Sequence, residues 1–418
     1  MKNVLFILLF NLVLAQTYTL EQCVDIALKN KVTVQSAELD VQSAVAGRKA
    51  SFSSLLPRAT LSSGLNDGET TVAGITAGQT TWSAGLALSS TLYDGGNTWR
   101  QARIDKFNVA AAEIAHTETV LKVKSDVYSA YYQALKARHL LQSAQEDLDL
   151  AREQLDLANL QFDLGAVKKT DALKAEVKYG QARAAFLSKQ IAVDNAKRRL
   201  ANAMGIVQSL EDFTIADLPG HPVNVPDFPS ALNEMKQHNP SLLRQKILVT
   251  TSALNYKVAG GARLPSLSAR GGYTTRADKA GGLLQDYNKN WDWSFGLSLS
   301  YPLFTGYALS SQTQQAKYRW MITQNLYTNL EDDLTVQLKT IINDLNNYQD
   351  ILPILEDILM AAEEDLKLAN ERYRLGAAII LEVLDAQVSV TQARTTLINT
   401  RYDALLQEVA LKTLLGTL

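Results

Sequence analysis

Apolar residues recur every three or four positions over residues 141–162. The positions are Leu141, Ala144, Leu148, Ala151, Leu155, Ala158 and Phe162. This spacing places the side chains on one stripe of an α-helix, as in helices that pack along a neighbour. No proline or glycine occurs from Asn97 to Asp163. The pattern therefore predicts one helix over 97–163, about 100 Å long at about 1.5 Å per residue.

The same stripe returns in the second half of the chain. Its members are Leu352, Leu355, Leu359, Ala362, Leu366, Ala369 and Tyr373. A second long helix is predicted over 308–374, and Pro353 inside it predicts a local kink. Large and small residues alternate in both stripes, which suits closely packed helices.

A Leu-Gly pair ends each long helical pattern, at Leu164-Gly165 and at Leu375-Gly376. Glycine suits the left-handed residue that follows a helix. Return helices are predicted over 170–204 and 381–415, so each half contains a helical hairpin with a tight tip. The apolar stripe of the second return helix is read as Leu384, Val388, Thr391, Thr395, Ile398, Tyr402, Leu405 and Val409.

Two strand-like segments precede each long helix, at about 57–67 and 80–92 and at about 265–276 and 291–303. They alternate polar and apolar residues, as strands do. Each is close to the ten or so residues that a tilted strand needs to cross a membrane. Aromatic residues near their ends would lie at the membrane surfaces; these are Trp82, Tyr93, Trp291, Trp293 and Tyr301. Soluble hairpins are the alternative interpretation.

The chain is a tandem repeat. "LANLQFDLGA" at 157–166 returns as "LANERYRLGA" at 368–377, and "SAGLALSSTLYDGG" at 83–96 matches "SFGLSLSYPLFTGY" at 294–307. Both matches have the same spacing. We therefore expect a first repeat over 16–206 and a second over 231–418, joined by a proline-containing linker at 207–230. Further helices are predicted at about 19–54 and 230–260.

The N-terminus has the pattern of a secretory signal peptide over 1–15. Lys2 precedes an apolar run from Val4 to Leu14, and Ala15 lies at a small-residue cleavage site. The run is too short to span a membrane. A buried N-terminal helix is the alternative.

Composition narrows the classes of function. The formal net charge is −2, so no basic excess points to a nucleic acid. The single cysteine, Cys23, excludes an intrachain disulfide, and the four histidines lack metal-site spacing. No nucleotide-binding glycine motif occurs. We expect neither catalysis, nor a metal, nor a cofactor.

Four strands cannot close on themselves. Because an open sheet edge in lipid leaves backbone groups unpaired, strands from other copies of the chain must complete a barrel. The same assembly would surround one axis with long helices. The sequence thus predicts a mainly α protein with a membrane β-barrel portion, and the number of copies stays open at this point.

Three segments together resemble the TolC-like outer-membrane efflux proteins: "ERYRLGAAIILEVLDAQVSVTQARTTL" from residue 371, "YTLEQCVDIALKN" from residue 18, and the closing "LLGTL". The resemblance implies a homotrimer with a 12-stranded barrel on a 12-helix periplasmic tunnel. It implies location in the outer membrane, a periplasmic adaptor and an inner-membrane pump as partners, and a passive gated duct for efflux or type I secretion. The cargo is not indicated.

The resemblance also implies roles for single residues. Tyr373 aligns with a gate tyrosine, and Asp171, with Thr170 before it, aligns with its partners, so the resemblance implies a hydrogen bond between Tyr373 and Asp171. Ala378 stands where the family has an arginine, which predicts a looser latch. The alternative is that Tyr373 is a packing residue of the helical stripe.

Glu382 and Asp385 align with acidic residues at the constriction, where three copies would favour cations. The alternative is that both are solvated charges at a helix start. The adaptor-contact tips would be Leu164, Gly165, Ala166, Leu375, Gly376 and Ala377, residues that plain helix-turn chemistry also explains. Two other functions stay open: a periplasmic coiled-coil scaffold, and an outer-membrane binding protein without a through-pore.

Overall fold

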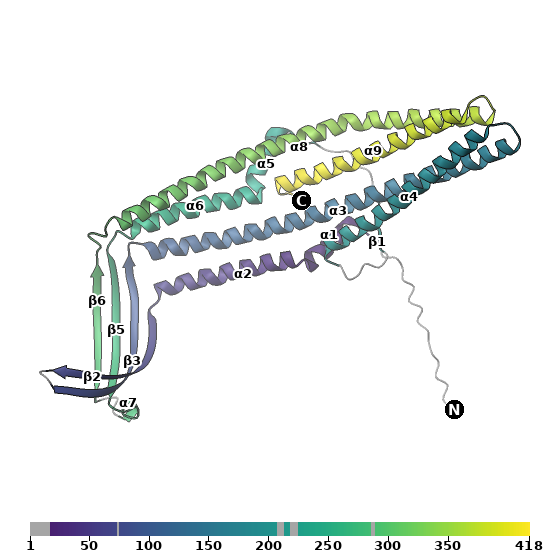
Figure 1. The fold of residues 1–418 in the computed structure, drawn as a ribbon. Coiled ribbons are helices and arrows are strands. Elements are labelled where there is room, and N and C mark those ends of the chain that lie inside the picture. The colour runs from purple at the N-terminus through teal and green to yellow at the C-terminus, as the bar shows by residue number, and fades with distance from the viewer. Residues whose placement is uncertain (1–16, 73–74, 207–212, 218–224, 286–288) are drawn as a thin grey trace, which may run out of the picture. The chain divides into compact units, whose positions relative to one another are not determined.

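The computed structural model describes residues 17–72, 75–206, 213–217, 225–285 and 289–418. The predicted signal peptide lies outside the described residues, as do 207–212 and 218–224 of the predicted linker. Two similar series of elements follow one another along the chain (Figure 1). They are β1 (Thr17–Tyr18), α1 (Leu20–Asn30), α2 (Val32–Phe52), η1 (Ser53–Leu55), β2 (Arg58–Val72), β3 (Ile75–Asp94), α3 (Asn97–Asp163), α4 (Lys169–Met204), β4 (Thr214–Ile215), α5 (Phe228–His238), α6 (Pro240–Gly261), β5 (Ser266–Ala277), α7 (Gly282–Gln285), β6 (Trp291–Ser300), α8 (Ala308–Arg374) and α9 (Ile380–Leu415).

The chain divides into two compact units, and each takes segments from both repeats. The helical unit comprises Met1–Gln35, Thr117–Asn239 and Asp332–Leu418, and the sheet unit comprises Ser36–His116 and Pro240–Glu331. The long helices α3 and α8 contribute to both units. Among the described residues, no helix is both long enough and apolar enough to cross a membrane.

The sheet unit contains an antiparallel sheet with the strand order β2-β3-β5-β6. Its register brings apolar residues opposite one another, because Leu61 pairs with Leu86, Leu86 with Tyr273, and Tyr273 with Trp293. Successive side chains of a strand point to opposite faces, so these residues share one face. The residue pairs on the opposite face of the sheet are polar, as in the pair of Thr274 with Asp292.

The strand ends differ from the predicted ones. β2 extends to Val72, and β3 starts at Ile75. The two strands form a hairpin that extends beyond the part of β3 that pairs with β5. Threonine, which favours strands, recurs in that stretch, but polar and apolar residues do not alternate there, so the pattern predicts no strand over it. β6 ends at Ser300 rather than at 303, since Pro302 has no N–H to donate to a strand ladder.

The predicted unbroken helices at 19–54 and 230–260 are wrong in one respect. Each is two helices, with a break at Lys31 and at Asn239, both of which have extended backbone angles. Pro240 explains the second break, because a residue before proline is disfavoured in the helical region. The first break has no proline, so the sequence carried no comparable signal there.

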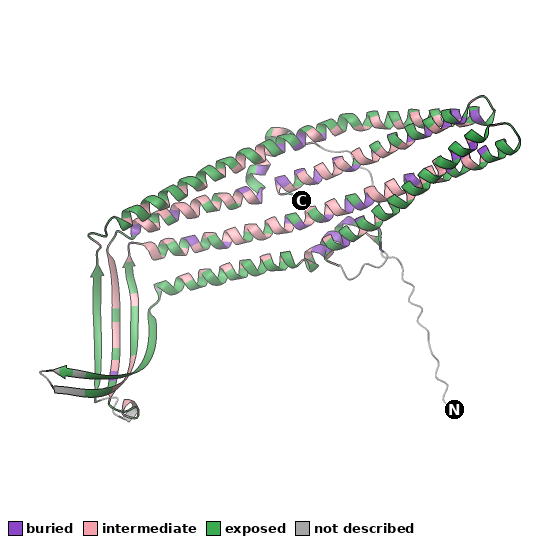
Figure 2. Cartoon of the chain, in the orientation of Figure 1, coloured by how far each residue is buried: buried purple, intermediate pink, exposed green. Residues whose placement is uncertain are grey.

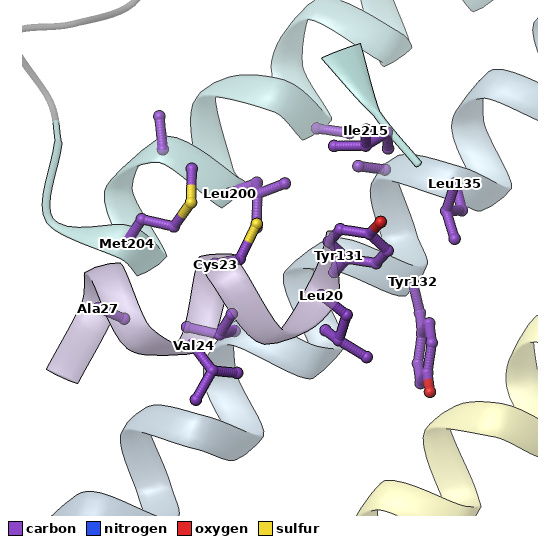
Figure 3. Packing of buried hydrophobic residues seen from close by; sticks show 14 of the residues in the cluster. Leu20, Cys23, Val24, Ala27, Tyr131, Tyr132, Leu135, Leu200, Met204 and Ile215 are labelled. Carbon is purple, nitrogen blue, oxygen red and sulfur yellow. The ribbon is translucent and has the colours of Figure 1, made fainter. Parts of the chain in front are cut away.

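α1 packs its apolar face into the largest apolar cluster of the helical unit (Figure 3). The helix starts at a capping box, in which Thr19 accepts from the Gln22 N–H and Gln22 accepts from the Thr19 N–H. Its buried residues are Leu20, Cys23, Val24 and Ala27. Burial raises the pKa of Cys23 to about 11, so the thiol is a packing group at neutral pH.

The small residues of the α3 stripe are the buried ones. Ala144, Ala151 and Ala158 are buried, whereas the large residues between them are only partly covered (Figure 2). Alanine at these positions allows a neighbouring helix to approach closely. In α8, Ala369 and Tyr373 of the corresponding stripe are buried, and Pro353 lies inside the helix.

The predicted stripe of α9 is wrong in its first half. Val383, Ala386 and Val390 are buried there, whereas Val388 is 48% exposed. The buried face is rotated by one position because α9 packs on Ala369 and Tyr373 of α8. From Tyr402 to Val409 the predicted and observed faces agree.

Candidate functional site at the helical tips

Both tips close with the same backbone hydrogen bonds. In the first, Gly165 N–H donates to Phe162 C=O and Ala166 N–H donates to Gln161 C=O, each at 2.8 Å. In the second, Gly376 and Ala377 make the corresponding bonds at 3.0 and 2.8 Å. This is the Schellman arrangement, which requires a left-handed residue after the helix. Gly165 and Gly376 both have φ of 73°.

The tips expose their leucines and differ in chemistry. Leu164 is 75% exposed and Leu375 is 83% exposed. After the shared Leu-Gly-Ala, the first tip continues with the exposed Lys168 and Lys169, and the second with Ile379, which is 62% exposed. Tips with the same backbone therefore present a basic surface in one repeat and an apolar surface in the other.

Tyr373 lies in an apolar cluster just before the second tip. It is 4% exposed and packs with Ala369, Ile380, Val383 and Ala386. Its hydroxyl has no hydrogen-bond partner among the described residues, so the predicted bond to Asp171 is not formed in this structure. Burial raises the pKa of the phenol, and the nearby charge of Asp171 raises it further.

The other gate and constriction residues are accessible. Thr170, Glu382 and Asp385 are exposed, and Asp171 lies in the first turn of α4, as Glu382 lies in that of α9. Glu382 faces Arg372 at 3.3 Å, in an ion pair with both side chains largely in solvent. The structure thus brings Asp171 and Tyr373 together electrostatically and keeps Glu382 and Asp385 on one exposed helix start.

Within the helical unit, α3 and α9 lie side by side between α4 and α8 (Figure 1). Lys136 of α3 bonds to Asp403 of α9 at 2.9 Å. Arg394 of α9 bridges Glu146 of α3 at 2.6 Å and Glu363 of α8 at 2.7 Å. α4 and α8 are therefore the outer helices of this unit.

Each outer helix exposes an apolar heptad stripe. On α4 the large members are Leu173, Val177, Leu187 and Ile191, and on α8 they are Ile351, Ile354, Ile358 and Leu368. Steps of three and four connect the members of each set through small or polar residues. Such a stripe is the packing surface of a coiled coil and is costly to leave in water.

Charges flank the two stripes with opposite sign. On α8, acidic residues recur every seventh position at Asp350, Asp357, Glu364 and Glu371, all of them exposed. On α4, the flanking positions are mainly basic, with Lys174, Arg183 and Lys197 against one acidic residue, Glu176. Flanking charges of this kind set partner choice in coiled coils.

Sequence reasoning missed the residues that join the two hairpins. These residues are Asp147 of α3 and Gln387 and Arg394 of α9. Their partners lie more than two hundred positions away in the chain, so no local spacing marks them. Within the described ranges, no group of three or more His, Cys, Asp or Glu side chains could hold a metal ion.

The family of outer membrane efflux proteins matches this chain over residues 23–206 and 231–417. The chain belongs to that family. The unmatched segment between the two ranges falls within the predicted linker. Membership supports the resemblance seen in the sequence and accounts for the repeat.

Individual members of the family are similar to this chain over most of its length. The outer membrane protein TolC of Vibrio cholerae is 25% identical over 408 residues, which cover 92% of this chain and 89% of the relative. TolC of Escherichia coli is 24% identical over 352 residues, covering 80% of this chain and 69% of the relative. The crystal structure of VceC from Vibrio cholerae has the same fold, with a TM-score of 0.84, 17% identity, and coverage of 95% of this chain and 96% of that one.

Proposed function

We propose that this outer membrane efflux protein is one subunit of a passive gated duct that exports cargo across the outer membrane. The observation that carries the proposal is that, among the described residues, β2 and β6 are edges of the sheet and the outer helices α4 and α8 each expose an apolar stripe. Every such edge has a complementary edge at the other side of the same unit. A subunit of this kind is completed by copies of itself arranged around an axis.

The amphipathic sheet supports insertion in a bilayer. One face carries Leu61, Leu86, Leu88, Trp293, Phe295, Leu297 and Leu299, all of which are exposed. The opposite face carries small and polar residues. An apolar outer face and a polar inner face are what a lipid-embedded barrel needs.

The sheet edges support closure by three copies. Among the described strands, β2 and β6 each pair with one neighbour and form the two edges. β2 of one copy is antiparallel to β6 of the next in a ring, and three copies supply the twelve strands of an even-numbered barrel. The alternative of a soluble scaffold leaves the exposed apolar face without an explanation.

The outer helices support the same arrangement. The apolar stripe of α4 with its mainly basic flank meets the apolar stripe of α8 with its acidic flank from the next copy, because the two stripes cover comparable distances from the tips. Three copies then place the helices α3, α4, α8 and α9 in a twelve-helix tunnel. The contact is head-to-tail, and it closes a ring when the rotation between copies is one third of a turn.

The tips form the periplasmic mouth of this duct. We place the gate at Tyr373, Asp171 and Thr170, since the Asp171 charge acts on the buried Tyr373 phenol. Glu382 and Asp385 supply the carboxylates of the constriction. The exposed tips, Leu164 to Ala166 and Leu375 to Ala377, are the contact surface for a periplasmic adaptor, which connects the duct to an inner-membrane pump.

Conductance tests the duct directly. The purified, detergent-solubilised protein added to planar lipid bilayers should produce discrete ion-conducting steps that prefer cations. Asp171→Ala should enlarge them, because it removes the carboxylate facing Tyr373. Glu382→Gln with Asp385→Asn should lower the cation preference. A protein that inserts yet never conducts, also as the Asp171→Ala variant, contradicts the proposal and favours a binding protein without a through-pore.

A further inference from the structure

A cavity lies between α3, α4 and α9 inside the helical unit. Its volume is about 210 Å³, and its lining includes Ser143, Asp147, Lys178, Gln387 and Thr391. Apolar packing would be the ordinary content of a helix junction. Here a carboxylate and a buried amide lie among the apolar lining residues, away from the tip residues to which the duct function assigns roles.

Gln387 is the most buried polar residue of this cluster. It is 1% exposed, and its Nε2 donates to the backbone oxygen of Asp147 at 3.4 Å. Its Oε1 accepts no hydrogen bond within the described residues. A buried acceptor without a donor is costly, so this position favours any neighbour that can supply a proton.

Asp147 is the neighbour that can gain such a proton. Thr391 Oγ1 lies 3.0 Å from Asp147 Oδ2 and donates to it. Burial is the largest influence and raises the pKa of this carboxyl, against the Thr391 hydrogen bond, which lowers it. In the ionised state the Asp147 side chain has only acceptors, whereas the protonated acid has an O–H that it can donate.

The surrounding charges compensate the carboxylate incompletely. Arg394 of α9 and Lys178 of α4 lower the pKa of Asp147, and Glu146 of α3 raises it. The two terminal nitrogens of Arg394 already form ion pairs with Glu146 and Glu363. Lys189 of α4 lines the cavity at its other end. No described ion pair within 4 Å joins either lysine to Asp147.

We propose that Asp147, Gln387 and Thr391 form a pH-sensitive contact that ties α3 to α9 more tightly when Asp147 is protonated. Because α9 begins directly after the second tip, acidification should hold the duct mouth closed. This consequence rests on the proposed duct function. The contact itself is a property of the helical unit and does not require conduction.

The sign follows from the direction of the pKa shift. A carboxyl whose pKa is higher in the folded than in the unfolded chain opposes folding when it is ionised. That penalty is full above the folded pKa, declines as the pH falls through it, and is gone below the unfolded value near 3.8. The α3–α9 contact is therefore tightest in acid.

Hydrogen exchange of the full-length protein in detergent tests the contact. Protection factors of α9 over 383–397, corrected for intrinsic rates, should rise between pH 7.5 and pH 4, which lies close to the unfolded value near 3.8, by up to about tenfold for each unit of pKa shift. Asp147→Asn, whose amide can donate to Gln387, should show the high protection at both pH values. Asp149→Asn removes an exposed charge of the same helix and should behave like the unaltered protein.

Two results overturn the proposal. One is protection of α9 in the unaltered protein that does not change with pH, a measurement that needs no variant to fold. The other is a pH response of Asp147→Asn that equals that of Asp149→Asn. Bilayer conductance at the same pH values distinguishes a failure of the α3–α9 contact from a failure of the proposed duct function. A pH-dependent contact in a protein that never conducts leaves the contact standing and removes the duct.

Discussion

At the scale of single residues, the junction between the sheet and α3 depends on two adjacent glycines with different constraints. Gly95 and Gly96 both have positive φ, 71° and 79°. A Cβ on Gly95 would lie 2.3 Å from the carbonyl oxygen of Gly261, whereas one on Gly96 would meet only the Arg100 side chain at 3.5 Å. The position that matches Gly96 in the second repeat is Tyr307, which has φ of 67°.

This difference predicts unequal effects of one substitution. Gly96→Ala should cost about 1–2 kcal/mol, the strain of a left-handed non-glycine residue, which Tyr307 bears in the second repeat. Gly95→Ala should cost clearly more, because the backbone of α6 must move as well. The midpoint of thermal unfolding followed by circular dichroism measures both. Equal midpoints for the two variants would contradict the close approach of Gly95 and Gly261.

At the scale of elements, α9 shows where periodicity stops being informative. Its sequence contains two overlapping stripes, one through Val383 and Val390 and one through Leu384 and Val388. Both have helical spacing, so the choice between them depends on where the neighbouring helices lie. The contacts with Ala369 and Tyr373 of α8 select the first.

The same substitution on each stripe tests that choice. Val383→Ala should destabilise the protein by about 2 kcal/mol, since it removes two buried methyl groups from a side chain with no exposed surface. Val388→Ala, at 48% exposure, should change the stability by a fraction of that. Thermal unfolding of both variants in the same detergent is the measurement. A larger loss for Val388→Ala would mean that the stripe first read from the sequence is the buried one.

At the scale of the whole molecule, the outer helices predict how copies recognise one another. Asp357→Lys with Glu364→Lys reverses two flanking charges of α8 and should abolish the trimer, because like charges then face Lys174 and Arg183 of the next copy. Adding Lys174→Glu and Arg183→Glu should restore it. Asp149→Lys with Asp156→Lys on α3 is the matched control, with two exposed charges seven positions apart.

Chemical crosslinking and native mass measurement of the purified protein report the assembled fraction. We expect trimer for the control and for the fourfold variant, and monomer for the α8 variant. If the α8 variant assembles as well as the control, the contact between α4 and α8 of neighbouring copies is wrong.

The sequence by itself determined the elements whose causes are local. An uninterrupted helical period gave α3 and α8, glycine after leucine gave both tips, and alternation gave the position of the sheet strands. The duplication linked the two halves and, with the resemblance, indicated the family. Each of these signals depends on residues within a few turns of one another or on direct comparison of two segments.

Only the tertiary structure decided which faces are covered and which polar residues meet. Asp147 and Gln387 lie 240 positions apart, and each is an ordinary helical residue until α3 and α9 pack together. The apolar stripes of α4 and α8 are exposed among the described residues because α3 and α9 lie between these two helices. Burial is a property of the packed helices, and no periodicity along one helix contains it.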